Sequence, residues 1–291
     1  MPETASIGDR LERAAVTLER AGHSGARREA RALWAAVTGV SPGAVWLARD
    51  TDARGPEVAR FEAALARRCA GVPFAYAVGR TAFRDLELAV DERALIPRPE
   101  TEGLVALALR VLGPGLGAPR RGRAADIGTG CGCIALALAA EGDFAEVVAV
   151  ERSSGAAALA RENVARVGPP VPVEVREGDL LEPLRGERFR AIVSNPPYLT
   201  TAELAALDWS VRGCEPTAAL DGGPDGLAPT CRLLAHAREL LEPAGILALE
   251  IDERRAGAVV SLGVRYGWAR TAIHEDLFGR PRYAIAYGET P

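Results

Sequence analysis

The chain has 291 residues, of which 48% are hydrophobic and 25% charged, so it is an ordinary globular sequence long enough for two domains. All 35 basic residues are arginine, which excludes every mechanism that needs a lysine, such as a Schiff base or a phosphate-binding P-loop. The net charge of −4 argues against naked nucleic acid as the main partner.

The N-terminus and the cysteines indicate a cytoplasmic protein. The first ten residues, MPETASIGDR, lack the apolar stretch of a signal peptide, and no apolar run reaches the ~18 residues that a membrane span needs. The five cysteines form no CxxC pair and no secretory disulfide pattern. Cys131 and Cys133 have no third ligand nearby in the sequence, so we expect no metal site.

Residues 1–75 are predicted to form a helical domain. Apolar residues recur at helical spacing in three stretches, 7–21, 26–38 and 56–69, and Ser41-Pro42-Gly43 interrupts the pattern. Residues 1–80 carry 12 arginines and 9 acidic residues, a local charge of +3 that leaves −7 for the rest of the chain. This mild asymmetry is weak evidence for a recognition surface in the N-terminal part.

The next part of the chain joins this domain to a larger one. Residues 76–94 are interpreted as a linker with β character around 83–90, and a loop containing Pro97 and Pro99 follows. A helix is predicted near 101–112. The Pro- and Gly-rich segment Gly113–Gly122 separates that helix from what comes next.

From residue 123 onward, short apolar strands alternate with helices. Strands are predicted at 123–127, 146–151, 171–175, 189–194, 244–251, 269–275 and 282–287. Helices are predicted at 132–140, 154–167, 226–241 and 253–262. Such alternation predicts a parallel sheet with helices on both faces. Only residues 276–281 join the last two strands, so the last strand must be antiparallel. The predicted fold is therefore α/β, with the seven-stranded Rossmann-like sheet of class I methyltransferases in residues 95–291.

The strongest local motif directly follows the strand at 123–127 and reads Gly128-Thr129-Gly130-Cys131-Gly132. Glycines here let the backbone turn sharply and approach a ligand closely, as in dinucleotide-binding loops. The dinucleotide fingerprint needs a glycine at position 133, where this chain has Cys133. A GxGxG run after an acidic residue is more typical of S-adenosylmethionine sites, although an ordinary glycine-rich turn is the alternative.

Two further strand ends support a nucleoside cofactor. Glu151 ends the second strand, 23 residues after Gly128, where an acidic side chain can accept both ribose hydroxyls. Asp179 and Leu180 follow the third strand, in position to hold the adenine amine and cover the ring. Each feature alone has an ordinary explanation, an exposed glutamate or a common loop dipeptide. Their order on successive strand ends favours S-adenosylmethionine.

The most specific run in the chain follows the fourth strand and reads Asn195-Pro196-Pro197-Tyr198. The lone pair of an amide or exocyclic amine is delocalised, so methylating such a nitrogen requires hydrogen-bond acceptors that position and polarise it. The side-chain oxygen of Asn195 and the main-chain carbonyl of Pro196 are the candidate acceptors. The prolines stiffen the loop, and Tyr198 supplies a flat face for a planar substrate. A turn or linker is the alternative interpretation of this run.

At this point the chain resembles the protein-(glutamine-N5) methyltransferases of the HemK/PrmC type, which modify class I peptide-chain release factors. The Asn-Pro-Pro-Tyr signature is shared with adenine amino-methyltransferases, but other segments are typical of the glutamine enzymes. These are Arg67-Arg68, Gly71-Val72-Pro73-Phe74-Ala75-Tyr76, Gly79-Arg80-Thr81-Ala82-Phe83, Leu95-Ile96-Pro97-Arg98-Pro99-Glu100-Thr101-Glu102, Glu215-Pro216, Ala219-Leu220 and Gly222-Gly223-Pro224-Asp225-Gly226-Leu227. The resemblance covers residues 67–282.

The resemblance implies a role for each candidate residue. The cofactor would contact Gly128, Thr129, Gly130, Cys131, Gly132, Glu151, Asp179, Leu180 and Asn195. The glutamine would be held by Asn195, Pro196, Pro197 and Tyr198, and the site would be lined by Phe83, Arg98, Pro99, Glu100 and Thr101. The N-terminal helices would grip a class I release factor as protein substrate, with no direct contact to nucleic acid or membrane.

Three residues depart from the family's pattern, and two other functions stay open. Cys214 stands where an aromatic residue or histidine is usual, and Asp252 and Arg255 replace a usual glycine and glutamine. These positions leave the methyl-transfer chemistry intact but bear on the choice of substrate, so another protein or a small amide is an alternative. The rival functions are an adenine methyltransferase acting on nucleic acid and a non-catalytic scaffold that binds the cofactor.

Overall fold

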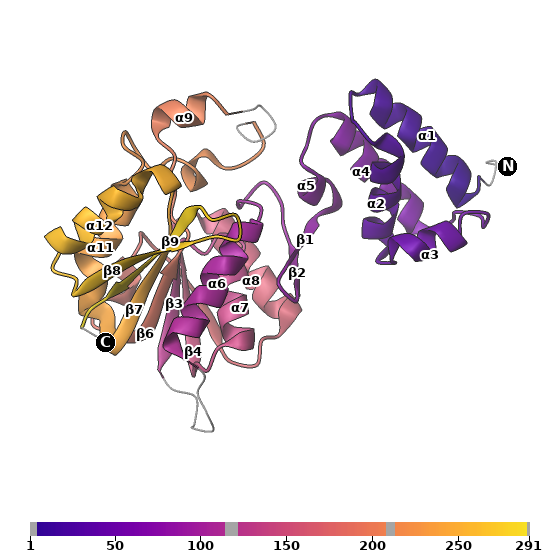
Figure 1. Ribbon diagram of the computed structural model, residues 1–291. Helices are drawn as coiled ribbons and strands as arrows, with labels where there is room; N and C mark the ends of the chain where they lie inside the picture. The colour runs from indigo at the N-terminus through magenta and orange to yellow at the C-terminus, as the bar shows by residue number, and fades with distance from the viewer. Residues whose placement is uncertain (1–4, 114–121, 208–212, 290–291) are drawn as a thin grey trace. The chain divides into compact units, whose positions relative to one another are not determined.

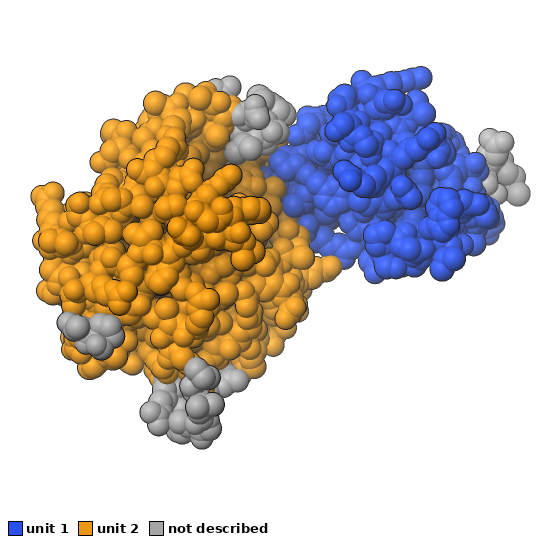
Figure 2. Space-filling model, viewed as in Figure 1, with its two compact units in different colours: residues 1–80 blue, residues 81–291 orange. Residues whose placement is uncertain are grey.

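The structure is a computed structural model that describes residues 5–113, 122–207 and 213–289. The chain divides into two compact units, residues 1–80 and 81–291 (Figure 2). The Pro- and Gly-rich separator predicted at Gly113–Gly122 lies largely outside the described residues.

Unit 1 consists of helices, as the apolar periodicity predicts. They are α1 (Ile7–Arg20), α2 (Ala26–Thr38), α3 (Pro42–Leu47), α4 (Pro56–Cys69) and α5 (Phe74–Val78). A capping box starts α1: the Ser6 hydroxyl accepts from the Asp9 N–H, and the Asp9 carboxylate accepts from the Ser6 N–H. The buried faces of α1, α2 and α4 meet around Leu18, Leu33 and Phe61, none of which is exposed.

Helices α3 and α5 are not predicted from the apolar pattern of the sequence. Ser41-Pro42-Gly43 ends the periodicity of α2, but it also begins α3. The Ser41 hydroxyl accepts a hydrogen bond from the Ala44 N–H at 3.2 Å. Pro42 occupies the first helical position, where its missing N–H would have no partner anyway. A Ser-Pro pair can therefore start a helix as readily as it ends one.

The segment with predicted β character is a hairpin of two short strands, β1 (Arg80–Phe83) and β2 (Leu86–Ala89). The turn between them places Arg84 at a φ of 51°. The Arg84 N–H donates to Glu102 Oε1 at 3.0 Å, and its guanidinium pairs with the Glu141 carboxylate. These partners lie 18 and 57 residues away, so tertiary contacts fix a turn that local sequence does not indicate.

Unit 2 contains the predicted seven-stranded sheet (Figure 1). Its strands are β3 (Arg123–Ile127), β4 (Glu146–Glu151), β5 (Val173–Glu177), β6 (Phe189–Ser194), β7 (Leu241–Glu250), β8 (Arg270–Glu275) and β9 (Pro281–Tyr287). The strand order is β5-β4-β3-β6-β7-β9-β8, and β9 pairs antiparallel with both β7 and β8. The predicted fold class is confirmed, including the antiparallel last strand.

Helices cover both faces of this sheet. They are α6 (Pro99–Leu112), α7 (Cys133–Glu141), α8 (Ser154–Val167), α11 (Ala228–His236) and α12 (Ala256–Arg265), whereas α9 (Thr201–Ala205) lies in the loop after β6, beyond the ends of the strands (Figure 1). Successive strand residues point to opposite faces. Along β6, Ala191 and Val193 join the core with α6, α7 and α8, whereas Ile192 joins the core with α11 and α12. The short α9 is not predicted by the sequence; the Thr200 hydroxyl caps it by accepting from the Glu203 N–H.

The carboxyl ends of the parallel strands lie along one edge of the sheet. In the strand register, Ile127 pairs with both Val150 and Ser194, and Ser194 pairs with Leu249. The Ser194 hydroxyl reinforces this edge by donating to the Ile127 carbonyl at 2.7 Å. The loops that follow β3, β4, β6 and β7 therefore converge at the edge where open α/β sheets bind ligands. Within the described residues, no helix has both the length and the apolar character required to cross a membrane.

Candidate active site

The glycine-rich loop after β3 is folded back onto the end of β4. The N–H groups of Gly128 and Thr129 both donate to the Val150 carbonyl, at 2.9 and 3.0 Å. Gly128, Gly130 and Gly132 have φ values of 72°, 57° and 89°, which favour glycine strongly. At Gly128 a Cβ atom would meet nothing within 4 Å, so the loop leaves open space on that side.

Glu151 occupies the end of β4 beside this loop, as the sequence places it. Its Oε2 accepts from the Gly130 N–H and its Oε1 accepts from the Ser153 N–H, both at 2.9 Å. Each carboxylate oxygen can accept more than one hydrogen bond. Glu151 is therefore oriented by the backbone and keeps acceptor capacity for hydroxyl groups of a ligand.

Asp126, the residue before the last of β3, lies beneath the loop with no exposed surface. Its Oδ2 accepts from the Thr129 hydroxyl and from the Ala135 N–H, but no described residue bonds to its Oδ1. Burial raises the pKa of this carboxyl to about 7, against the opposing effect of the two hydrogen bonds. A buried acidic oxygen without a partner suits a cationic group of a ligand.

The loop is also held from below by Asn163 of α8, which the sequence analysis missed. This side chain has no exposed surface. Its Nδ2 donates to the carbonyls of Cys131 and Ala89 at 2.8 and 2.9 Å, and its Oδ1 accepts from the Ala89 N–H at 2.7 Å. An asparagine inside an otherwise apolar helix face is the only local signal that could have revealed it.

Asp179 and Leu180 lie in the turn after β5. Asp179 forms an ion pair with Arg232 of α11 at 2.8 Å, with about a third of the Asp179 side chain and half of the Arg232 side chain exposed. Such an exposed pair is weak, so it leaves Asp179 available to a ligand. Leu180 has a φ of 52° and packs against the core beneath α11. Arg232 is not found by the sequence analysis.

A chain of hydrogen bonds connects the loop after β6 with α6 and β7. Asn195 Nδ2 donates to Thr101 Oγ1 at 3.0 Å, and Thr101 Oγ1 donates to Glu250 Oε2 at 2.7 Å. The Tyr198 hydroxyl donates to the other carboxylate oxygen, Glu250 Oε1, at 3.3 Å. Thr101 and Glu250 are 2% and 1% exposed. The sequence analysis places Asn195, Thr101 and Tyr198 at the site but misses Glu250, an acidic residue that ends an apolar strand.

These contacts leave two hydrogen-bond acceptors free beside one another in the chain. No described residue donates to Asn195 Oδ1 or to the carbonyl oxygen of Pro196. Burial raises the pKa of Tyr198 and of Glu250. Water-poor surroundings of this kind strengthen any hydrogen bond that a bound amide makes.

The Arg98–Thr101 segment, predicted to line the site, is held in place by several contacts. Arg98 pairs with the buried Glu215 at 2.6 Å, which joins it to the Glu-Pro segment after the catalytic motif. Burial raises the pKa of Glu215, and Arg98 opposes that rise. Pro99 occupies the first turn of α6, and the Glu100 carbonyl accepts from the Tyr283 hydroxyl at 2.8 Å.

Phe83 has a different position from the other predicted lining residues. Only 1% of it is exposed, and it belongs to the core cluster that contains Leu88 and Leu104. Any influence of Phe83 on the site therefore passes through the packing beneath α6.

The glycines after the catalytic motif allow two loops to approach closely. A Cβ atom at Gly222 would lie 2.7 Å from the Pro197 carbonyl oxygen, and one at Gly226 would lie 2.5 Å from that of Tyr198. Only glycine fits at these positions, because any side chain would push the backbone of the motif aside. The Gly222–Leu227 segment thus supports the Asn195–Tyr198 loop from behind.

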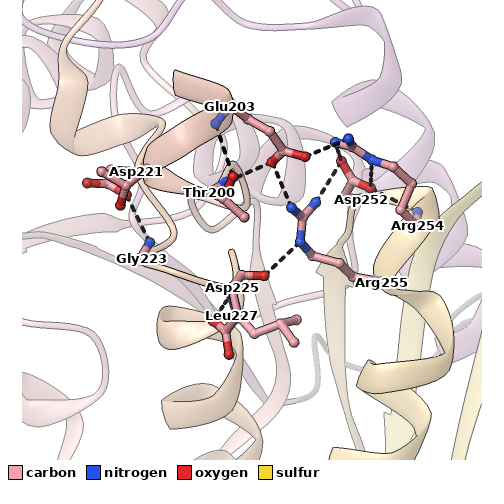
Figure 3. A network of polar contacts seen from close by, with 10 residues as sticks. Thr200, Glu203, Asp221, Gly223, Asp225, Leu227, Asp252, Arg254 and Arg255 are labelled. Atoms are coloured by element: carbon pink, nitrogen blue, oxygen red, sulfur yellow. Dashed lines mark hydrogen bonds and ion pairs between the residues drawn. The ribbon is translucent and has the colours of Figure 1, made fainter. Parts of the chain in front are cut away.

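Two of the residues that depart from the family pattern stabilise the same region (Figure 3). Arg255 donates to Glu203 Oε2 at 2.7 Å and to the Asp225 carbonyl at 2.8 Å, and it pairs with Asp252 at 3.0 Å. Arg254 pairs with Glu203 and Asp252 as well. The Arg255 and Asp252 side chains are only 11% and 8% exposed, so this network is partly desolvated. It anchors α9 and the glycine segment to the start of α12.

The site residues fit a nucleoside cofactor with a positively charged group. The open space at Gly128, the carboxylate of Glu151 and the unpartnered Oδ1 of Asp126 lie around one loop at the sheet edge. The described residues contain no group of three or more His, Cys, Asp or Glu side chains that could hold a metal ion. S-adenosylmethionine, with its ribose hydroxyls and cationic groups, matches this donor and acceptor set.

Family models match both parts of the chain. The model described as "PrmC N-terminal domain" matches residues 9–79, and the "Methyltransferase small domain" matches residues 105–209. Among solved structures, a methyltransferase from Pyrococcus furiosus aligns with a TM-score of 0.54 at 20% identity, covering 76% of this chain and 98% of the other. The hMettl16 catalytic domain aligns with a TM-score of 0.55 at 18% identity, covering 80% and 82%. These structures support the fold alone.

Closer relatives align over most of the chain. The release factor glutamine methyltransferase of Rhodospirillum rubrum is 40% identical over 96% of this chain and 84% of its own length. Those of Geobacter sulfurreducens and Deinococcus radiodurans are 39% and 40% identical, over 97% and 96% of this chain and 96% and 98% of their own lengths.

Proposed function

The chain belongs to the family of release factor glutamine methyltransferases, and from this premise we propose that it transfers a methyl group from S-adenosylmethionine to the side-chain amide nitrogen of a glutamine in a class I peptide-chain release factor. The family relationship supports a glutamine substrate over adenine in nucleic acid and over another protein or a small amide. An enzyme of translation is expected in the cytoplasm.

The observation that carries this proposal is the orientation of the Asn195 carboxamide. Its NH₂ group donates to Thr101, so its oxygen is left for a substrate, next to the unbonded carbonyl of Pro196. A primary amide presents two N–H donors, and these two acceptors match them. Accepting both hydrogens raises electron density on the nitrogen and fixes its direction of attack.

In the proposed mechanism, the protein positions and polarises the amide without using a strong base. S-adenosylmethionine supplies an electrophilic methyl group bound to a sulfonium. Asn195 and Pro196 would hold the two amide hydrogens and keep the nitrogen directed at the cofactor's methyl group. On methylation the nitrogen would lose one of these hydrogens as a proton to solvent, and the sulfur would keep the electron pair of the broken C–S bond. Pro197 and Tyr198 keep the loop rigid and exclude water from one side of the amide plane.

The remaining site residues receive roles in the same proposal. Gly128, Thr129, Gly130, Cys131 and Gly132 form the loop that approaches the methionine part of the cofactor. Glu151 accepts the ribose hydroxyls, Asp179 accepts the adenine amine, and Leu180 covers the ring. Arg98, Pro99 and Glu100 line the entrance for the glutamine, whereas the buried Thr101 contacts Asn195 from behind. Residues 1–75 recognise the release factor, 76–94 link the two parts, and 95–291 carry the chemistry.

A transfer assay tests the substrate class. The protein is incubated with S-adenosylmethionine labelled in its methyl group and, in separate reactions, with a purified release factor, duplex DNA or RNA. We expect label in the release factor alone, and none when Asn195→Ala replaces the wild-type enzyme. Label in a nucleic acid with none in the release factor would contradict the proposal.

A further inference from the structure

Glu250 and Thr101 lie behind Asn195, 149 residues apart in the chain, and control which way its carboxamide faces. A carboxylate can only accept hydrogen bonds. With Glu250 ionised, the single hydroxyl hydrogen of Thr101 is therefore committed to Glu250 Oε2. Toward Asn195, its other neighbour, Thr101 Oγ1 can then only accept a hydrogen bond, so Asn195 must present an N–H group to it. The Asn195 amide is consequently held with Nδ2 toward Thr101 and Oδ1 away from it.

We propose that Thr101 and Glu250 are positioning residues that keep the oxygen of Asn195 directed at the nitrogen to be methylated. This inference rests on the proposed function, because the orientation matters only if Asn195 must accept a hydrogen from the substrate. It assigns Thr101 a role behind the catalytic asparagine, and it assigns Glu250 a role that the sequence pattern does not suggest.

The orientation depends on the protonation state of Glu250. A protonated Glu250 could donate to Thr101, and the Thr101 hydrogen could then turn toward Asn195 Oδ1. The carboxamide would reverse and present NH₂ to the substrate's own NH₂, which repels it. The groups that face Glu250 are Arg282 and Tyr283 of β9, Glu100 and Thr101 of α6, and Tyr198. Burial raises its pKa above the ordinary value for glutamate, while Thr101, Arg282 and Tyr198 lower it. Activity at saturating cofactor should therefore fall as the pH drops through the pKa of Glu250.

The composition of the chain provides a direct probe of the carboxamide. The sequence contains no glutamine and only two asparagines, Asn163 and Asn195. A proton–nitrogen correlation spectrum of the uniformly ¹⁵N-labelled protein thus shows only two pairs of side-chain NH₂ signals. The pair absent from Asn195→Ala belongs to Asn195, and the Asn163 pair serves as an internal control. This probe needs neither substrate nor turnover, so it reports on the orientation even if the proposed substrate is wrong.

Four variants test the inference. Thr101→Val removes the hydroxyl at almost constant volume, and Thr101→Ser restores it. We expect Thr101→Val to shift the Asn195 NH₂ pair and to lower kcat on the order of 10²-fold, with the affinity for S-adenosylmethionine unchanged. Thr101→Ser should keep the wild-type signals and most of the activity. Unchanged cofactor affinity also shows that the Val variant is folded.

Glu250→Gln separates orientation from packing. A glutamine side chain can either donate to Thr101 or accept from it, so it imposes no direction, and it adds a third NH₂ pair to the spectrum. We expect the Asn195 pair to titrate with pH in the wild type and to lose that titration in Glu250→Gln, together with the acidic decline of kcat. Glu177→Gln is the matched control, at the end of a strand two strands beyond β3. It should leave the titration of the Asn195 signals and the acidic decline of kcat unchanged.

Two outcomes would overturn the inference. One is that Thr101→Val keeps both the wild-type NH₂ signals and the wild-type kcat, and the other is that the Asn195 signals do not depend on Glu250. If the orientation responds as expected but the wild-type enzyme methylates no release factor, the proposed function fails and the positioning of Asn195 stands.

Discussion

The side chain of Asn163, in the middle of α8, donates to the carbonyl oxygen of Cys131 at 2.8 Å and so holds the Gly128–Gly132 loop in place. The same side chain makes two hydrogen bonds with the backbone of Ala89 in β2. One buried amide therefore satisfies three backbone groups from two segments of unit 2. Such support orders a loop with three positive-φ glycines, because glycine restricts the backbone less than any other residue.

Asn163→Leu should reduce both stability and cofactor binding. The leucine fits the volume but leaves backbone groups of Cys131 and Ala89 buried without partners, at a cost of about 1–3 kcal/mol for each unsatisfied group. We expect a lower urea midpoint and weaker binding of S-adenosylmethionine by calorimetry. Asn163→Asp keeps the acceptor but loses the donor, so it should not restore the Cys131 contact. Wild-type affinity and midpoint in Asn163→Leu would show that the contact is unimportant.

Glu151→Ala should weaken binding of S-adenosylmethionine by about 10- to 100-fold. Hydrogen bonds to a charged carboxylate typically contribute about 1.5–3 kcal/mol, and Glu151 also orients the Gly130 N–H. Calorimetry measures the change. The matched control is Glu177→Ala, since Glu177 pairs with Glu151 in the strand register but lies on the outer strand β5. An equal loss of cofactor affinity in both variants would show that Glu151 does not bind the ribose.

Asp126 should make both stability and cofactor binding depend on pH. The pKa of Asp126 is raised to about 7, mainly by burial, whereas an unfolded aspartate titrates near 3.8. Between these values the folded protein retains a proton that the unfolded chain releases, so this carboxyl lowers the free energy of unfolding as the pH rises from about 4 to 7. Cofactor affinity should change in the opposite direction, because only the ionised carboxylate attracts a cationic ligand.

The matched variant for this prediction is Asp126→Asn, which preserves the shape of the side chain and removes its titration. Urea unfolding and calorimetry between pH 5 and pH 8 should show both pH dependences reduced in the variant. A wild-type affinity that is constant over this range would contradict a direct role of Asp126 in binding the cofactor.

Asn195→Ala should lower kcat by roughly 10²–10³-fold, the loss expected when one preorganised polar contact to a reacting group is removed. Cofactor affinity is measured in the same variant, because Asn195 is also placed near the cofactor. Asn195→Asp is the sharper comparison, since a carboxylate still accepts a hydrogen bond. We expect it to retain more activity than Asn195→Ala. Equal inactivity with normal cofactor binding would mean that the NH₂ group that reaches Thr101 is the essential feature.

The sheet could be predicted from the sequence because its strands are short apolar runs buried on both faces. Strands β3, β4 and β6 begin and end at the predicted residues. Strand β5 begins and ends two residues later than the predicted 171–175, because Val171 and Pro172 belong to the loop before the strand. Glu151 and Asn195 could be placed at one edge of the sheet because the ends of parallel strands meet there.

The features that could not be predicted depend on contacts between distant residues. Arg84 adopts its turn because Glu102 and Glu141 approach it from helices. Glu250 looks like any acidic strand end until the fold places Thr101 beside it. Arg255 looks like a solvated helix residue, yet it is only 11% exposed and joins three segments. Periodicity and local motifs carry no information on such pairs.

The most direct test of the account is to locate the transferred methyl group. A purified release factor is incubated with S-adenosylmethionine and the wild-type enzyme, digested, and sequenced by fragment-ion mass spectrometry. We predict a mass gain of one CH₂ group on a single glutamine, located on the side-chain amide nitrogen, and no gain with Asn195→Ala. A methyl group on any other residue type, or an unmodified release factor after full incubation with active enzyme, would contradict it.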